Sequence, residues 1–271
     1  MSQALTLERC VVRATGGRHG RTRALAPGSS DARHLHYGRI VLPGGAPLRF
    51  STEGHETGLI GLAGRATVEV AGQHFDLGRY DALYVPRDSQ VEVLPSAEGC
   101  DLAEVSAPVE GSYPLQYVAW AQVQSDPGLH FRAGEPPTER VINVLLGKNV
   151  EAGRILAGVT FSTPGNWTSW PPHEHAELAE EAYLYIDMPA PAFGLQMVYT
   201  DKTTPELAVV VREGDVVLMP KGYHPNVAAP GCSIGFLWMM AATREVEDRK
   251  FGVVNVQPEY AGGSSGLERG R

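Results

Sequence analysis

Cysteine and positive charge are both scarce in this chain of 271 residues. The three cysteines, Cys10, Cys100 and Cys232, form no CxxC pair, so the sequence favours neither a disulfide scaffold nor a thiolate zinc site. Lys and Arg number 23 against 31 Asp and Glu, which gives a net charge of −8. Because nucleic acids and anionic membranes are bound through basic surfaces, we expect neither as a partner.

Long hydrophobic runs and extended helical periodicity are also missing. The longest apolar stretch runs from about Ile234 to Ala242, which is too short to span a bilayer. The N-terminus, Met1–Cys10, lacks the basic region and apolar core of a secretory signal. Together with the scattered cysteines, these absences predict a cytoplasmic protein.

Glycine, proline and alternating apolar residues are abundant instead. The 31 Gly and 20 Pro residues are typical of a turn-rich β protein. Short apolar runs recur about every ten residues and predict an all-β fold of antiparallel strands in a sandwich or barrel. These runs are 66–70, 83–85, 91–94, 155–161, 182–186, 195–199, 208–211 and 216–219. The segment 116–124 fits a strand or a short helix equally well.

A degenerate internal repeat divides the chain. The segment Gly78–Pro86 resembles Gly214–Pro220, since each has a Gly turn, an apolar strand and a Pro. Two copies of one β unit predict two similar domains in tandem. Prolines cluster at 127–137, so we place the boundary there, with domains at 1–130 and 131–260. The Gly- and Ser-rich segment 261–271 is expected to be a flexible tail.

Histidines and acidic residues gather in two stretches of the second half. His173 and His175 are two residues apart, so on a strand both imidazoles face the same side. Glu180 or Glu181 opens the next apolar run, and His224 follows a Gly-x5-Pro-x-Gly turn. Three imidazoles and one carboxylate suit a borderline divalent metal such as zinc, manganese, iron, nickel or cobalt.

This spacing of His-x-His, Glu, Gly-x5-Pro-x-Gly and a final His resembles the two cupin motifs. The stretches Thr163–His175, Val198–Asp201, Gly214–Pro225 and Ala228–Gly231 resemble more closely the 5-deoxy-glucuronate isomerase family of inositol catabolism. That family is related to 5-keto-4-deoxyuronate isomerase. The resemblance implies a bicupin, with two tandem antiparallel jelly-roll barrels, of which only the C-terminal one binds metal.

The same resemblance implies a ligand set and a reaction. The metal ligands would be His173, His175, His224 and a glutamate, for which we favour Glu181 because it directly precedes an aromatic strand. Zinc is the expected ion, with manganese, iron or nickel as alternatives. The reaction would convert 5-deoxy-glucuronate to 2-deoxy-5-keto-gluconate. Only five residues separate His175 from Glu181, fewer than in the inositol-pathway enzymes. A 5-keto-4-deoxyuronate isomerase, a cupin dioxygenase and a non-enzymatic sugar-binding cupin are therefore kept as alternatives.

An aldose–ketose isomerase also needs groups that handle protons and bind its substrate. Candidate bases are the glutamate of the Glu180/Glu181 pair that is not the ligand, Glu174, and a tyrosine among Tyr183, Tyr185, Tyr199 and Tyr223. Of these we select Glu180 and Tyr185 as catalytic residues. A sugar-acid substrate carries a carboxylate, for which Lys221 and Arg154 are candidate cations. His34 and His36 lack a partner Glu at cupin spacing and are interpreted as ordinary surface or interface histidines. Exposed strand edges favour a homo-oligomer, and the segment Phe251–Val256 looks able to add a strand.

Overall fold

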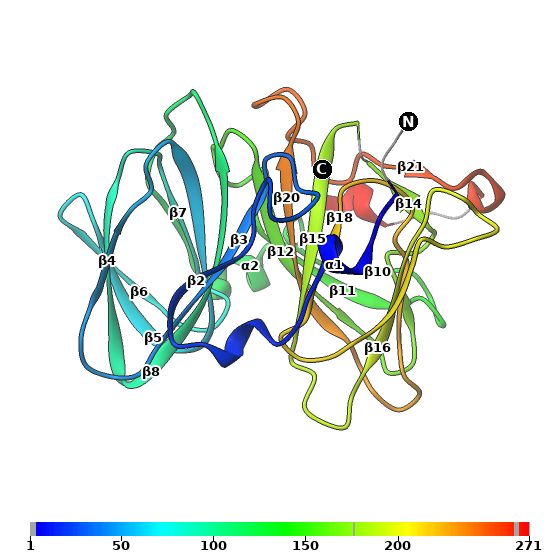
Figure 1. The fold of residues 1–271 in the computed structure, drawn as a ribbon, viewed down its shortest axis with the longest axis horizontal. Helices are drawn as coiled ribbons and strands as arrows, with labels where there is room; N and C mark the ends of the chain where they lie inside the picture. Colours follow the sequence, from blue (N-terminus) through cyan, green and yellow to red (C-terminus); the bar gives the residue numbers. More distant parts are fainter. Residues whose placement is uncertain (1–3, 176, 263–265, 271) are drawn as a thin grey trace.

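The protein folds into two β-rich lobes that lie side by side, as Figure 1 shows. The computed structural model describes residues 4–175, 177–262 and 266–270. Within these residues, no helix has the length and apolar character needed to cross a membrane. Strands dominate both lobes, as the alternating pattern predicts.

The first lobe is an antiparallel sheet of eight strands. Its main path runs in the order β2-β3-β8-β5-β7-β9, with β4 paired to β8 and β6 paired to β5. The strands are β2 (Gly20–Leu25), β3 (His36–Leu42), β4 (Leu48–Ser51), β5 (His55–Val70), β6 (Gln73–Leu77), β7 (Ala82–Val85), β8 (Gln90–Pro108) and β9 (Gln116–Val118). The long strands β5 and β8 shift register at Gly61/Ala63 and Gly64/Ala66. Such bulges bend a sheet, which lets these two strands follow it around the apolar interior of the lobe.

The second lobe pairs a larger sheet with a smaller one. The seven-stranded sheet has the order β1-β18-β15-β20-β12-β11-β10, and the four-stranded sheet has the order β13-β19-β16-β17. The first contains β1 (Val11–Val12), β18 (Val216–Met219), β15 (Ala179–Ile186), β20 (Gly235–Ala242), β12 (Ile155–Ser162), β11 (Arg140–Leu146) and β10 (His130–Ala133). The second contains β13 (Trp167–Thr168), β19 (Asn226–Ala228), β16 (Gly194–Val198) and β17 (Leu207–Val211). A separate pair joins β14 (His173–Glu174) to β21 (Asn255–Val256).

The helices are short and lie at the periphery of the molecule. They are α1 (Leu7–Cys10), α2 (Trp120–Ser125) and the 3-10 turns η1 (Thr15–Gly17), η2 (Pro258–Tyr260) and η3 (Leu267–Gly270). The N-terminal segment crosses to the second lobe, because β1 pairs antiparallel with β18. Helix α1 and strand β1 therefore pack with β18, more than 200 positions later, although the predicted division assigned them to the first domain.

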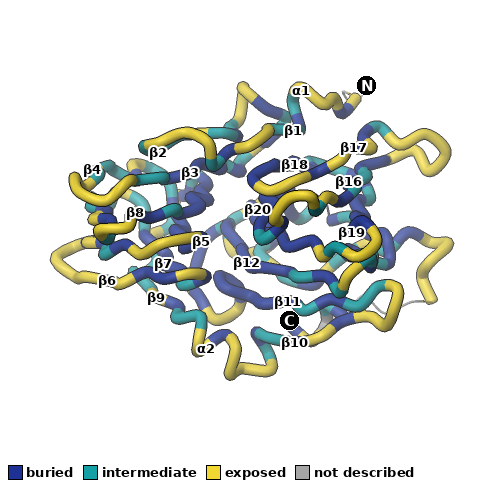
Figure 2. Tube along the Cα trace, turned by 90° about the horizontal axis from the view of Figure 1, so that it is seen from below, coloured by how far each residue is buried: buried dark blue, intermediate teal, exposed yellow. Residues whose placement is uncertain are grey.

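The lobes share one apolar core across their facing sheets. Tyr37 and Tyr84 of the first lobe belong to the same buried cluster as Leu146 and Ile155 of the second. At Gly58 an added Cβ would lie 2.6 Å from Leu146 Cδ1, so the glycine leaves room for the Leu146 side chain of the other lobe. Figure 2 shows the strands at the centre of the molecule buried and the peripheral loops exposed.

Most of the strand predictions are confirmed. Every apolar run picked out by alternation coincides with a strand or ends within one residue of it. The segment 116–124, for which the sequence left strand and helix open, contains both a strand and a helix. Strand β9 ends at Val118, and helix α2 begins at Trp120. The segment 251–256 does add a strand, but β21 pairs with β14 of its own chain. Of the predicted tail, residues 263–265 and 271 lie outside the described residues, and 267–270 form η3.

Candidate active site

The histidine-rich stretch lies on the short strand β14, which the C-terminal segment holds in place. His173 pairs in register with Val256 of β21, and Gln257 N–H donates to Pro172 O at 2.8 Å. His175 follows immediately after β14. The site therefore depends on a contact between residues about 80 positions apart, which no local sequence pattern predicts.

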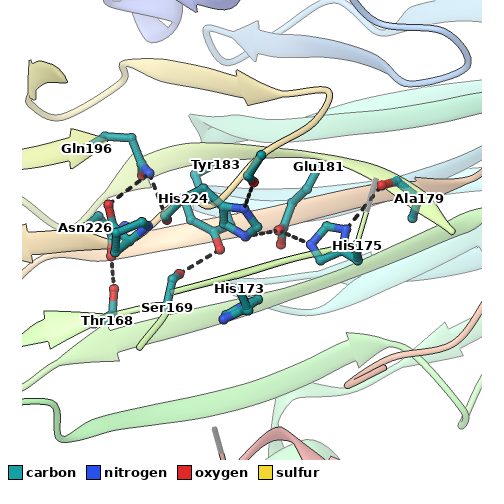
Figure 3. Close-up of polar contacts among 12 residues, drawn as sticks. Thr168, Ser169, His173, His175, Ala179, Glu181, Tyr183, Gln196, His224 and Asn226 are labelled. Atoms are coloured by element: carbon teal, nitrogen blue, oxygen red, sulfur yellow. Dashed lines mark hydrogen bonds and ion pairs between the residues drawn. The ribbon is translucent and has the colours of Figure 1, made fainter. Parts of the chain in front are cut away.

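Three ligand-type side chains converge inside the second lobe (Figure 3). One ligand atom each from His175, Glu181 and His224 lies within 4.8 Å of the other two. Glu181 Oε2 is 2.9 Å from His175 Nε2 and 3.1 Å from His224 Nε2. The ring of His173 stands beside this group, with its centroid 5.0 Å from that of His224. All four side chains are buried.

Each histidine is oriented by a backbone carbonyl at Nδ1. The Nδ1 atoms of His173, His175 and His224 lie 2.8, 3.1 and 3.0 Å from carbonyl oxygens. Those oxygens belong to Pro171, Ala179 and Gly222. A carbonyl only accepts, so Nδ1 carries the proton, and a neutral ring then presents a lone pair at Nε2. Oriented histidines of this kind are typical of metal sites.

The charge state of the cluster also fits a bound cation. His224 Nε2 is buried and makes no hydrogen bond, although it lies close to the Glu181 carboxylate. Burial opposes ionisation of Glu181, but its contacts with His175 and His224 outweigh burial and lower its pKa to about 2. Burial also disfavours a charged His175, yet the Glu181 carboxylate overcomes it and raises the His175 pKa. Positive charge is therefore favoured between these side chains, and a divalent metal would supply it.

His173 differs from the other two histidines. Burial, with a smaller effect from the neighbouring imidazoles, lowers its pKa to about 3. A neutral imidazole beside an ionised carboxylate is the form that binds a metal. The residues present thus fit a divalent cation, with His173 at the edge of the group.

A cavity of about 50 Å³ adjoins this cluster. Its walls combine polar groups near the histidines with a broad apolar surface. The lining residues are Arg140, Ile142, Thr160, Ser169, His173, His175, Glu181, Tyr183, Phe236, Trp238, Met240, 251–254 and Leu267. Tyr183 and Ser169 share a hydrogen bond of 2.8 Å between their hydroxyls. Burial raises the Tyr183 pKa well above 10, so this phenol stays protonated.

The adjacent residues Glu180 and Glu181 point to opposite faces of β15. Glu181 faces the histidines, whereas Glu180 is fully buried on the other side of β15. Glu180 accepts backbone N–H bonds from Arg33, His34 and Leu35 at 2.7, 2.5 and 2.5 Å. The structure does not bring this candidate base to the cavity, because alternate residues of a strand face opposite sides.

The other candidate residues also lie outside the cavity lining. Tyr185 is on the same face of β15 as Glu181, but its hydroxyl donates to Gln196 Oε1 at 2.5 Å and accepts from Asn226 Nδ2 at 3.0 Å. Lys221 is half-buried in the turn before His224. Arg154 sits between the lobes, where Nε donates to Pro108 O and Nη1 to Ala242 O, each at 2.9 Å.

Sequence reasoning missed the cavity residues that come from distant strands. Arg140 opens β11, and Thr160 and Trp238 lie on β12 and β20, none with a motif around it. Ser169 stands within the family-like stretch Thr163–His175, which was the one available signal for it.

Fold and site together define a cupin-like β protein with a buried His/Glu cluster in its second lobe. Oxalate decarboxylase from Bacillus subtilis shares the fold, with a TM-score of 0.62 and 14% identity over 86% of this chain and 77% of that chain. The crystal structure of an IolB-like protein from Salmonella typhimurium LT2 is more similar. It has a TM-score of 0.81 and 23% identity, and covers 93% of this chain and 98% of that one.

The chain belongs to the KduI/IolB family, whose sequence model matches residues 10–256. Its curated relatives include the 5-deoxy-glucuronate isomerase of Geobacillus kaustophilus, 32% identical over 234 residues that span 80% of this chain and 83% of the relative. The enzyme of the same name from Lacticaseibacillus casei is 28% identical over 72% of this chain and 76% of its own length. The protein is therefore an enzyme, an isomerase, as its motifs predict.

Proposed function

We propose that this protein isomerises 5-deoxy-glucuronate to 2-deoxy-5-keto-gluconate, an aldose–ketose conversion of inositol catabolism. The relatives named 5-deoxy-glucuronate isomerase support this substrate. The observation that carries the reaction class is the convergence of His175, Glu181 and His224 beside a cavity that His175 and Glu181 line. Such a donor set can hold the Lewis acid that an aldose–ketose isomerisation uses.

In this proposal His173, His175, Glu181 and His224 hold one divalent metal ion. Zinc is the proposed ion, and manganese, iron and nickel are the alternatives that elemental analysis separates. When bound, such an ion would supply Lewis acidity for the carbonyl and the neighbouring hydroxyl of the sugar. The backbone carbonyls at each Nδ1 hold the rings in place, and the Nε2 atoms of His175 and His224 both lie beside Glu181 Oε2.

The hydroxyl pair Tyr183–Ser169 is the proposed proton-bearing group beside the sugar. Tyr183 remains a phenol because its pKa is raised well above 10 by burial. A neutral phenol donates a hydrogen bond to a sugar oxygen as negative charge develops there. The apolar wall formed by Ile142, Phe236 and Trp238 excludes water and suits the deoxy carbon of the substrate.

We further propose that the two lobes are two cupin domains, residues 1–130 and 131–260, with the chemistry confined to the second. Within the described residues, the one group of three ligand-type side chains close enough to hold an ion is in the second lobe. The first lobe then has a structural or oligomeric role, and a homo-oligomer stays our prediction. The free cysteines support the cytoplasm as the compartment.

The test combines metal analysis with product detection. Purified protein is analysed for metal by mass spectrometry and incubated with 5-deoxy-glucuronate, and the conversion is followed by NMR. We expect about one metal per chain and a new ketose signal. The His224→Ala variant should lose both, whereas His36→Ala in the first lobe should keep both. Conversion of 5-keto-4-deoxyuronate alone, or full activity of the His224→Ala variant, would contradict the proposal.

A further inference from the structure

The first lobe contains a small cavity of about 100 Å³ whose lining is polar throughout. Its walls come from β2, from β5 and β8, and from the turn that joins β4 to β5. The lining residues are Arg21, Arg23, Ser51, Thr52, Glu53, His55, Thr57, Glu104 and Ser106. A cavity of this size has room for about three water molecules, or for one small ion of several atoms.

This cavity occupies the place in the first lobe that the histidine cluster occupies in the second. The strand order β3-β8-β5-β7 matches the order β12-β20-β15-β18. In the repeated segments that contain β7 and β18, Val85 and Met219 each stand directly before a proline. Thr57 of β5 pairs with Val85, just as Glu181 of β15 pairs with Met219. Thr57 therefore stands where the second lobe has its candidate metal-binding carboxylate.

Three donor side chains around the cavity have no hydrogen-bond partner within the described residues. Thr57 and Ser106 lie opposite each other on β5 and β8, and are 1% and 3% exposed. Their hydroxyls make no hydrogen bond, yet neither oxygen is enclosed, so both are open to the cavity. The guanidinium of Arg23, an exposed residue, likewise makes no hydrogen bond or ion pair there. Buried polar groups normally have partners, so these unused donors indicate a ligand that accepts hydrogen bonds.

The charges around the cavity favour an anion. Arg21 already neutralises Glu104, through two hydrogen bonds of 2.7 Å to its carboxylate. Glu53 is exposed, where solvent and salt screen its charge. Arg23 thus adds a positive charge that no contacting carboxylate balances. Burial and, to a smaller extent, Arg23 lower the pKa of His55, so its ring is neutral at pH 7 and still offers one N–H donor.

We propose that the first lobe binds a small oxyanion in this cavity, held by Arg23 and by the hydroxyls of Thr57 and Ser106. Carboxylate and phosphate groups fit, because both present several acceptor oxygens and pair with the planar fork of a guanidinium. Two sources supply such a group, a sugar acid and free inorganic phosphate, and the test separates them. The repeat would then hold a cation site in one lobe and an anion site at the equivalent place in the other.

The ring of His55 reports binding, because it lines the cavity. Histidine-labelled protein is titrated with sodium phosphate and, separately, with sodium glucuronate, and NMR follows the His55 resonance, which the His55→Gln spectrum assigns. Sodium chloride at equal ionic strength is the blank. We expect a saturable shift with at least one of the two anions. Arg23→Gln, a change at an exposed residue, should weaken that binding about 10- to 100-fold, because a hydrogen bond to a charged group is lost.

Further variants separate a specific site from a general effect of charge. Arg65→Gln removes an exposed arginine of β5 that lies outside the cavity lining, and it should bind the anion as wild type does. Thr57→Val keeps nearly the same shape without the hydroxyl, and should weaken binding about severalfold. His224→Ala should also bind as wild type does, because the proposed site is separate from the histidine cluster.

Each result of the titration has a definite meaning. A shift with glucuronate alone supports the site and assigns a sugar-acid carboxylate, and a shift with phosphate alone supports it and assigns inorganic phosphate. The absence of a saturable shift with either anion overturns the inference. Equal weakening in Arg23→Gln and Arg65→Gln overturns it as well, since the effect would then be one of net charge. Loss of binding in His224→Ala would move the anion to the second lobe and contradict the proposed site.

Discussion

Glu180 and Glu181 are adjacent on β15, and their carboxylates serve opposite faces of one sheet. Glu181 contacts His175 and His224 in the cavity, whereas Glu180 accepts three backbone N–H bonds from residues 33–35 ahead of β3. Glu56 in β5 makes the reciprocal contact, because it accepts N–H bonds from residues 153–155 at the start of β12. Each lobe therefore contributes one buried carboxylate that accepts backbone hydrogen bonds from the other lobe.

Glu181→Gln should abolish tight metal binding. The amide lacks the charge that balances a divalent cation, so we expect affinity to fall by about tenfold or more. Metal content after gel filtration measures the change. Glu180→Gln is the matched control, since it makes the same substitution one residue away on the opposite face, and it should retain the wild-type metal content. Equal metal loss in both variants would argue against Glu181 as the ligand.

Glu180→Gln should instead destabilise the fold. The amide nitrogen cannot accept from the N–H groups of residues 33–35, so at least one buried donor is left without its bond. We expect a loss of about 2–3 kcal/mol in the free energy of unfolding. Urea titration measures it, and kcat per folded molecule should stay near wild type. A large drop in kcat without loss of stability would return Glu180 to the role of a catalytic base.

The sequence predicts the strands well, and the residues that it names as ligands lie close together in the structure, because both depend on short-range patterns. Alternation with period two marks the strands, and the spacing of His173, His175 and His224 marks the cluster. The choice between Glu180 and Glu181 needs only the alternation of faces, once the position of β15 relative to the histidines is known. Sequence alone does not supply that position.

The cavity walls and the packing of the termini could not be predicted in the same way. Arg140 enters the site through strand order, and β14 is held by β21, which lies about 80 residues later. The pairing of β1 with β18 likewise joins positions 11 and 217. Such contacts are set by tertiary packing, and a β fold leaves little trace of them in local composition.

Metal removal should lower thermal stability. A ligand that binds only the folded state at 100 times its Kd stabilises it by about 2.7 kcal/mol. Chelation should therefore lower Tm, and adding zinc back should restore it, as scanning calorimetry can measure. The His224→Ala variant supplies the control, since its Tm should respond to neither treatment. A wild-type Tm that is indifferent to chelator and zinc would show that no tightly bound ion supports the fold.

Tyr183→Phe and Tyr185→Phe should have different effects, although both remove a buried hydroxyl from the same face of β15. Tyr183 lines the cavity and bonds Ser169, so its loss should lower kcat by about tenfold or more while metal binding persists. The Tyr185 hydroxyl is held by Gln196 and Asn226, so its loss should cost about 1–2 kcal/mol of stability with little change in kcat. Steady-state kinetics and urea titration on both variants test this. If Tyr185→Phe is inactive and Tyr183→Phe is active, then Tyr185, the residue selected from the sequence, is the catalytic tyrosine and Tyr183 is not.

The His36–His55 pair should make the first lobe sensitive to acid. Their rings meet edge to face with centroids 4.8 Å apart, and burial, with smaller effects from His55 and Arg23, lowers the His36 pKa from 6.5 to about 4. The unfolded chain thus takes up a proton before the folded one does, so this stability is present above pH 6.5 and is lost as the pH falls towards 4. Urea titrations at pH 7.5, 6 and 5 should show a decline that His36→Gln reduces. His74→Gln, which changes an exposed histidine, should keep the wild-type decline. An unchanged pH dependence in His36→Gln would mean that other groups cause the acid sensitivity.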